Sequence, residues 1–420
     1  FCKDGGHIYE NQTGDAACDQ YHRYKEDVQI MKEMGMKAYR FSLSWARIMP
    51  EGTGTVNEKG LKYYDNLINE LLDNGIEPFV TLYHWDLPYA LHLQGGWMNP
   101  NSPSWFYEYA KVVAEHFSDR VKNFFTINEP QCIVGLGYQT GEHAPGLKVG
   151  PSDYFRIWHN VLKAHGRAVE ALREFSKQPV KISMAPCGAL YVPETNKPED
   201  IEAARKANFS LPENSIGACS WDVALCCDPV YLGQYPEDIL KEFGQFFPKV
   251  TDADMKLISQ PLDFLGQNIY NAVTVRAGED GKAVRAARYD GFPQTAIGWP
   301  VTPEVLYWAP KFMQERYKKP FMITENGMAS HDWISVDGKV HDQARVDFMA
   351  RYLGAYKRAA EDGVDLAGYF AWSVMDNFEW AYGYSQRFGL VYTDYNTQKR
   401  TWKDSAYFYK NIIETNGENL

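Results

Sequence analysis

KAYRFSL at residues 37–43 and EPFVTLY at residues 77–83 decide the fold, together with the helical segment at residues 60–74 that lies between them. Both short stretches are mainly apolar and aromatic, which is typical of buried strands. In the segment between them, apolar residues such as Leu67 and Leu71 recur at helical spacing. A strand, a helix and a second strand in this order predict two parallel strands joined by a crossover helix.

The same alternation continues along the chain. It predicts further strands at residues 123–127, 180–185, 262–269, 320–324 and 366–372. It predicts further helices at residues 21–34, 103–117, 153–175, 302–317 and 342–362. Such alternation is typical of an α/β barrel, which commonly reaches about 250 residues or more as one unit. Because no Pro-, Gly- or Ser-rich linker interrupts it, we predict a single catalytic domain over residues 1–420.

The pattern yields seven strands, one fewer than a closed barrel needs. An eighth strand is expected upstream of the first helix, but residues 1–6, FCKDGG, have the composition of a loop. We therefore expect the first strand to be missing from this sequence and the edges of its two neighbours to be exposed. Three explanations stay open: the sequence omits residues of the native protein, the protein is truncated, or the strand is supplied from elsewhere. Two subunits could also pair along the exposed edge.

Composition excludes several classes of protein. The net charge of -11 argues against binding to nucleic acid, which needs a basic surface. No apolar run approaches the roughly 20 residues that cross a bilayer, so we expect no membrane contact. The seven cysteines are irregularly spaced and form no C-x-x-C pair, which argues against a disulfide framework or a zinc site. We expect no metal and no cofactor, in a reducing, cytoplasmic setting.

Barrel enzymes build their sites at the carboxyl ends of the strands, so the polar residues there are the candidates. They are Arg40, His84, Trp85, Asn128, Glu129, Asn268, Tyr270, Glu325, Asn326 and Trp372. A single Glu after a strand is usually a solvated surface residue, but Glu129 and Glu325 form a pair on one barrel. Paired carboxylates suit glycoside cleavage, since one can protonate the leaving oxygen while the other attacks or activates water.

Six motifs then make the chain recognisable as a whole. They are YRFS at 39–42, LYHWDLP at 82–88, TINEP at 126–130, GEHAPG at 141–146, ITENG at 323–327 and the run at 369–392. In this order they resemble glycoside hydrolase family 1, the β-glucosidase and β-galactosidase family, over nearly the whole chain. The resemblance implies a (β/α)8 TIM barrel and a retaining mechanism through a covalent glycosyl-enzyme.

The resemblance also implies a role for each candidate residue. Glu129 is the implied acid/base and Glu325 the implied nucleophile, with carboxyl groups about 5–5.5 Å apart. Arg40, Asn268 and Tyr270 are expected to orient or electrostatically support Glu325. The implied sugar contacts are His84 and Trp85 to hydroxyls, Asn128 to the 2-hydroxyl, Trp372 as the stacking floor, Glu379 and Trp380 at the 4- and 6-hydroxyl end, and Trp299 at the aglycone entrance.

Specificity follows from two positions. Family members that act on 6-phosphorylated sugars have a small residue where this chain has Glu379, and a carboxylate there would repel a phosphate. Glu129 stands where the thioglucosidase branch has Gln. We therefore expect the enzyme to cleave terminal, non-phosphorylated β-D-glucosides, and β-galactosides and β-fucosides as well. The expected substrates are β-linked oligosaccharides or aryl and alkyl β-glycosides. Such an activity would serve in cellulose degradation.

Two other functions compete with glycoside hydrolysis. The family's first strand carries a Gln-x-Glu-Gly segment that binds the sugar, and no such segment precedes Cys18. A weakly active or catalytically silent carbohydrate-binding relative is therefore the alternative function. A nicotinamide-dependent oxidoreductase lacks support, because Gly135 and Gly137 do not continue into a glycine fingerprint that opens a helix.

Overall fold

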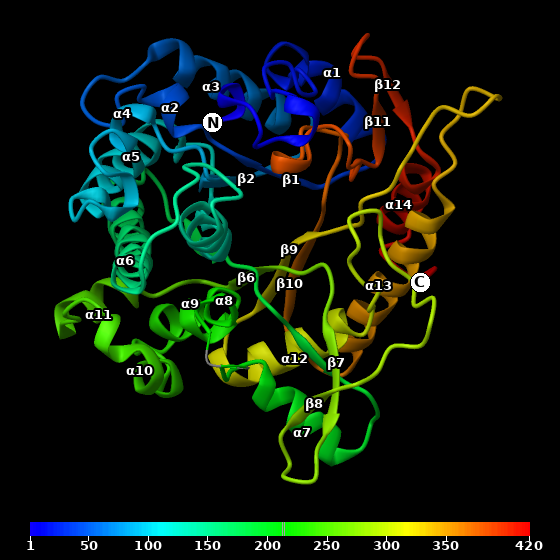
Figure 1. Ribbon diagram of the computed structural model, residues 1–420. Helices are drawn as coiled ribbons and strands as arrows, with labels where there is room; N and C mark the ends of the chain where they lie inside the picture. Colours follow the sequence, from blue (N-terminus) through cyan, green and yellow to red (C-terminus); the bar gives the residue numbers. More distant parts are fainter. Residues whose placement is uncertain (212, 214) are drawn as a thin grey trace.

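The computed structural model describes residues 1–211, 213 and 215–420. Parallel strands lie at its centre and helices surround them (Figure 1). The central strands are β1 (Ala38–Ser42), β2 (Glu77–Tyr83), β3 (Asn123–Asn128), β4 (Lys181–Ala185), β6 (Leu265–Asn268), β9 (Phe321–Asn326) and β10 (Leu366–Ala371). Hydrogen bonds order them as β1-β2-β3-β4 and β6-β9-β10, and β4 packs beside β6. All the predicted strands are confirmed; the largest difference is that β6 begins at Leu265 instead of residue 262.

The strands form because their side chains are covered on both faces. Every residue of β3 and β9 is buried, as expected for parallel strands between a filled interior and a layer of helices. Phe125, Phe264 and Met322 pack together inside the strands, and Phe79 and Phe370 pack against them. This apolar filling lies below the carboxyl ends of the strands, so the polar residues of those ends have a rigid support.

The strands β1 and β10 are less covered than the others. Ser42 of β1 and Ala367 of β10 are exposed, and each of the two strands pairs with a single neighbour in the described part of the chain. A cavity of about 1000 Å³ lies between them, with α13 (Gln343–Glu361) and α14 (Asp404–Glu414) on its outer side. The sequence pattern predicts a further strand between β1 and β10, and the described residues contain no strand ahead of β1.

The predicted helices are present around the strands. They are α1 (Gln20–Glu33), α3 (Glu58–Asp73), α5 (Ser102–Phe117), α6 (Pro151–Phe175), α12 (Val305–Tyr317) and α13. In α3 the Asn57 side chain accepts a hydrogen bond from the Lys59 amide and so caps the first turn. The face of α3 that includes Leu67 and Leu71 is buried, in agreement with the apolar spacing. None of the described helices is long and apolar enough to cross a membrane.

Other elements were not predicted. The shorter helices are α2 (Trp45–Ile48), α4 (Tyr89–His92), α7 (Pro198–Ala207), α8 (Ile216–Ser220), α9 (Val223–Tyr231), α10 (Glu237–Phe243), α11 (Asp252–Ile258) and α14. Two small sheets are formed by β5 (Tyr191–Pro193), β7 (Val273–Ala277) and β8 (Ala283–Arg285), and by β11 (Val391–Thr393) and β12 (Arg400–Trp402). The small sheets and α7 to α11 lie outside the central strands (Figure 1).

A buried ion cluster fixes the loops that follow β9 and β10. Lys403 Nζ lies 2.5 Å from Asp332 Oδ2 and 2.7 Å from Asp376 Oδ1, and all three side chains are at most 4% exposed. Arg345 also pairs with Asp332, and Arg387 with Asp376. These pairs tie the two loops to the segment before α14.

Candidate active site

Glu325 lies at the carboxyl end of β9 and has a donor on each carboxylate oxygen. Arg40 Nη1 donates to Glu325 Oε1 over 2.7 Å, and Tyr270 Oη donates to Oε2 over 2.6 Å. Arg40 comes from β1 and also donates from Nε to Thr81 Oγ1 at 3.1 Å, which holds the guanidinium in place. The structure thus brings Arg40 and Tyr270 to Glu325, where a fixed cation and a hydroxyl stabilise its negative charge.

Glu129 follows β3 and is buried, with 7% of its surface exposed. Asn268 Nδ2 donates to its Oε1 over 2.7 Å and Cys132 Sγ donates to its Oε2 over 3.1 Å. Its φ of 43° lies in the left-handed region, which costs a non-glycine residue about 1–3 kcal/mol. The Glu129 amide is held by a 2.8 Å hydrogen bond to the Ala185 carbonyl, so the surrounding strands fix this strained conformation.

The sequence predicts that Asn268 supports Glu325, whereas in the structure its side chain donates to Glu129. Asn268 stands beside Glu325 in the β6–β9 register, but its amide group donates to Glu129. The reason is Thr324, whose hydroxyl donates to Asn268 Oδ1 over 2.6 Å. This bond fixes the oxygen of the amide towards Thr324 and turns its NH2 group towards Glu129.

A continuous chain of hydrogen bonds joins the two carboxyl groups. Asn128 Oδ1 accepts from Asn268 Nδ2 at 3.1 Å and from Arg40 Nη2 at 2.6 Å. Glu129 is therefore linked through Asn268, Asn128 and Arg40 to Glu325. Because both donors occupy Asn128 Oδ1, its Nδ2 faces His84 Nε2 at 3.1 Å, and that ring nitrogen accepts.

Burial and neighbouring charge set the protonation of these groups apart. Burial, and then the negative charge of Glu325, raise the pKa of Glu129 to about 7. The same causes, with Glu129 added, raise the pKa of Glu379 to about 8. Burial, and then Arg40, lower the pKa of His84 to about 3, so its ring is neutral. One buried carboxyl group is thus poised to give up a proton near neutral pH beside another that is paired with a cation.

Aromatic rings form a wall around this network. His84 stacks on Trp372 and on Trp380, with ring centroids 6.0 and 5.8 Å apart, and Trp85 lies 4.5 Å from Trp380. The indole N–H of Trp85 donates to the Asn128 carbonyl at 3.0 Å. The expected contact of Trp85 with a sugar hydroxyl is therefore not supported by this geometry, because its N–H already donates to a carbonyl of the protein. Only the face of its ring remains available to a ligand.

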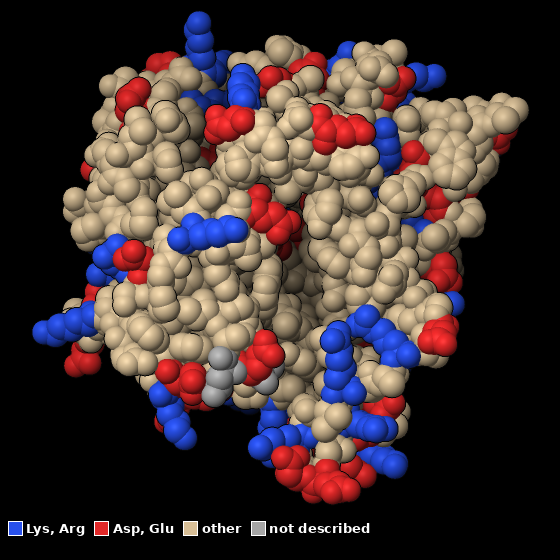
Figure 2. All heavy atoms as spheres, in the orientation of Figure 1, with Lys and Arg blue, Asp and Glu red and all other residues tan. Residues whose placement is uncertain are grey.

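Two further predicted residues border the network. Trp299 packs beside Tyr270, with ring centroids 5.0 Å apart, and is partly exposed. Burial, and then the charges of Glu325 and Glu129, raise the pKa of Glu379. Figure 2 shows a hollow in the middle of the molecule with acidic side chains at its edge.

Three residues that contact the candidate network are not predicted by the sequence. Thr81 and Thr324 orient Arg40 and Asn268, and Cys132 donates to Glu129. The spacing of three residues between Glu129 and Cys132, at the start of the π-helical segment Cys132–Thr140, was the available signal. A threonine within a strand gives no such signal.

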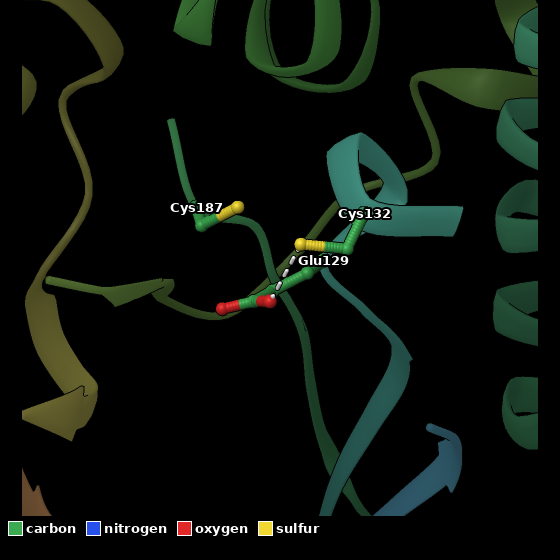
Figure 3. A group of neighbouring side chains, drawn as sticks. All are labelled: Glu129, Cys132 and Cys187. Carbon is green, nitrogen blue, oxygen red and sulfur yellow. Dashed lines mark hydrogen bonds between the residues drawn. The ribbon is translucent and has the colours of Figure 1, made fainter. Parts of the chain in front are cut away.

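A third group approaches Glu129 from another part of the chain. Cys187, which follows β4, points towards Cys132 and Glu129 (Figure 3). The two sulfur atoms and a Glu129 carboxylate oxygen all lie within 4.8 Å of one another. Burial raises the pKa of Cys132 well above its usual value and that of Cys187 to about 11, so both thiols are protonated and poor nucleophiles. Residues 129, 132 and 187 have no spacing that predicts a metal site.

This geometry agrees with the comparisons with known proteins. A family model described as Glycosyl hydrolase family 1 matches residues 1–418. The chain belongs to this family. The family 1 chain is similar to β-glucosidase A of Thermotoga maritima, with 46% identity over 99% of this chain and 91% of that protein. A bifunctional β-D-glucosidase/β-D-fucosidase of Bifidobacterium breve is 38% identical over 97% of this chain and 90% of that protein.

The fold comparison gives the same family. The solved structure of the Thermotoga maritima β-glucosidase in complex with glucoimidazole matches with a TM-score of 0.89 and 45% identity, over 99% of this chain and 92% of that chain. The predicted TIM-barrel class of this family 1 chain is confirmed.

Proposed function

We propose that this family 1 protein is a retaining β-glycosidase that hydrolyses terminal β-D-glucosides. The proposal rests on one observation, the pair of buried carboxyl groups that have different partners. Glu325 accepts from a cation and a phenol, whereas Glu129 accepts from an amide and a thiol. The relatives that are named β-glucosidases support the same activity.

In the first step Glu129 donates its proton to the glycosidic oxygen while a Glu325 oxygen attacks the anomeric carbon. The bond from that carbon to the leaving oxygen breaks, and the aglycone departs as an alcohol. In the second step Glu129, now ionised, removes a proton from water. The water oxygen bonds to the anomeric carbon, the bond to Glu325 breaks, and both groups return to their starting states. We predict a carboxyl separation of about 5–5.5 Å, as retention requires.

The sugar lies, in this proposal, between the aromatic wall and the hydrogen-bond network. Neutral His84 offers a ring N–H to a hydroxyl, Trp372 provides the stacking face, and Asn128 binds the 2-hydroxyl. Glu379 and Trp380 contact the 4- and 6-hydroxyl end, and Trp299 borders the aglycone.

The acidic environment disfavours phosphorylated sugars. Glu379 adds a third carboxyl group to the pair Glu129 and Glu325, and burial and the charges of that pair raise the pKa of Glu379 to about 8. The same burial and negative charge oppose the entry of a phosphate dianion, and an ionised Glu379 would add to the repulsion. We infer that non-phosphorylated β-glucosides are the substrates and that β-galactosides and β-fucosides are accepted. The fucosidase activity in the name of the Bifidobacterium breve relative is consistent with this.

We also infer a single catalytic domain that works in a reducing, cytoplasmic environment. Buried residues from Val28 to Ile412 belong to one continuous hydrophobic cluster, and all seven cysteines are free. Disulfides form and persist in oxidising compartments, so free thiols throughout favour a reducing one.

The test is release of p-nitrophenol from p-nitrophenyl β-D-glucoside and from its 6-phosphate. We expect turnover of the glucoside, loss of at least about 1000-fold in Glu325→Ala, and no change in Glu108→Ala, which alters an exposed glutamate of α5. Equal traces from wild type and Glu325→Ala, with sugar binding retained, would indicate the silent binder instead. Preference for the 6-phosphate would refute the specificity.

A further inference from the structure

We propose that Glu129, Cys132 and Cys187 bind one soft divalent cation, Zn²⁺ or Cd²⁺, and that the bound ion inhibits the enzyme. Binding follows from the positions of the three side chains. The inhibition rests on the proposed function of Glu129 as the acid, whereas the binding does not.

The positions of the three ligand atoms fit a tetrahedral ion. Zinc bonds to sulfur and to carboxylate oxygen are about 2.0–2.3 Å long, so ligand atoms around a tetrahedral ion lie roughly 3.3–3.8 Å apart. Here Cys132 Sγ lies 3.1 Å from Glu129 Oε2, and no pair among the three ligand atoms exceeds 4.8 Å. Small rotations of the side chains therefore suffice to close the site around an ion.

The Gln131 side chain holds the two segments of the site together without the ion. Gln131 Nε2 donates to the Cys187 carbonyl over 2.8 Å, and the Cys187 amide donates back to Gln131 Oε1 over 3.3 Å. These two bonds fasten the loop after β4 to the chain that connects Glu129 and Cys132. The site is thus assembled from two segments far apart in sequence. Folding has already ordered both segments, so binding of the ion does not have to supply the free energy for this.

The chemistry of the donor set selects the class of ion. Two sulfur ligands and one carboxylate favour Zn²⁺ and Cd²⁺ over Mg²⁺ and Ca²⁺, which prefer oxygen alone. On binding, each thiol loses its proton to solvent as the metal–sulfur bond forms, and no oxidation occurs. The three protein ligands leave a fourth position for water. Cys187 is partly exposed, which gives the ion a path to the site.

Occupation of this site removes the proton that Glu129 has to donate. The effect on kcat/KM therefore depends on the leaving group. A p-nitrophenyl or alkyl glucoside needs proton donation, whereas 2,4-dinitrophenolate leaves without it. An ion that merely blocked the entrance would inhibit both substrates alike.

The experiment titrates the full chain with Cd²⁺ and follows the ultraviolet absorption of cadmium thiolate bonds. We expect one ion per chain by calorimetry, loss of the band in Cys132→Ser and in Cys187→Ser, and an unchanged band in Cys2→Ser, which alters a thiol outside the cluster. In parallel, the inhibitory midpoint of Cd²⁺ should rise at least 10-fold in both cluster variants. Inhibition should be weaker with the dinitrophenyl glucoside.

Retention of the band in either cluster variant, or an absence of the band in the wild type, would overturn the site. Equal inhibition of the two substrates would overturn the stated cause of inhibition. If the chain shows no glycosidase activity, the proposed function fails while the absorption still decides whether the ion binds. Thermal melting identifies a variant that does not fold, and Cys187→Ala then replaces it in the same titration.

Discussion

Arg40 Nη1 lies 2.7 Å from Glu325 Oε1, and both side chains are only 6% exposed. Three further N–H groups of Arg40 donate to Thr81 Oγ1, to the Thr324 carbonyl and to Asn128 Oδ1. A buried ion pair is favourable when its other hydrogen bonds are satisfied, and it is costly when one partner is lost. The guanidinium therefore orients the carboxylate of Glu325 and joins this group to the network of Glu129.

We predict that Arg40→Lys lowers kcat/KM by about 10- to 150-fold. A lysine keeps the charge but cannot reach Glu325 and Asn128 together, and a hydrogen bond to a charged group contributes about 1.5–3 kcal/mol. The matched control is Arg358→Lys, which changes an exposed pair with Glu304 and should leave kcat/KM unchanged. Steady-state kinetics on an aryl glucoside measures both. An Arg40→Lys enzyme with wild-type kcat/KM would show that the simultaneous contacts of the guanidinium with Glu325 and Asn128 have no role in catalysis.

Removal of the phenol on the other side of the nucleophile should have a similar effect. Tyr270→Phe deletes the 2.6 Å hydrogen bond to Glu325 Oε2, and we expect kcat/KM to fall about 10- to 100-fold with little loss of stability. Tyr407→Phe, at an exposed position of α14, serves as the control in the same assay. A loss of folding stability that accounts for the whole effect would argue that Tyr270 has a structural role instead.

The pH profile should reflect the protonation of Glu129. Burial and Glu325 raise its pKa to about 7, so the acid is protonated below that pH and is lost as the pH rises through it. We expect kcat/KM for p-nitrophenyl β-D-glucoside to fall tenfold per pH unit above about pH 7. The fall should be weaker for the 2,4-dinitrophenyl glucoside, whose leaving group needs no proton. Identical profiles for the two substrates would contradict this assignment of the acid.

The strands and long helices could be predicted because each gives a periodic pattern over its length. The segment between β4 and β6 could not. In α9 every residue from Val223 to Val230 is buried, so there is no polar face to produce a helical period, and Pro229 within it argues against a helix. The neighbouring helices α8, α10 and α11 are too short for a clear period.

Prediction from sequence has a different limit at the candidate active site. Strand ends identified its residues, but side-chain orientation depends on neighbours that are distant in sequence. The β6–β9 register places Asn268 beside Glu325, yet the hydroxyl of Thr324 turns its amide towards Glu129. Cys187 reaches Glu129 only because β4 lies next to β3. Such contacts follow from packing and not from local pattern.

We predict that loss of Lys403 destabilises the loops behind the site. Lys403→Met leaves Asp332 and Asp376 buried without the cation that contacts both. Breaking a buried pair by removing one partner typically costs about 3–5 kcal/mol. Burial lowers the pKa of Lys403, and the charges of Asp376 and Asp332 oppose this shift. We expect the free energy of unfolding in urea to fall by about that amount.

Lys111→Met is the matched control, because its pair with Glu115 on α5 is exposed, and exposed pairs contribute about 0–1 kcal/mol. The double variant Lys403→Met with Asp376→Asn should recover part of the loss, since it removes one of the two uncompensated charges. Equal unfolding free energies for Lys403→Met and Lys111→Met would mean that Arg345 and Arg387 alone neutralise the two aspartates. Recovery in the double variant would instead locate the cost in the buried charge itself, as the geometry of the cluster requires.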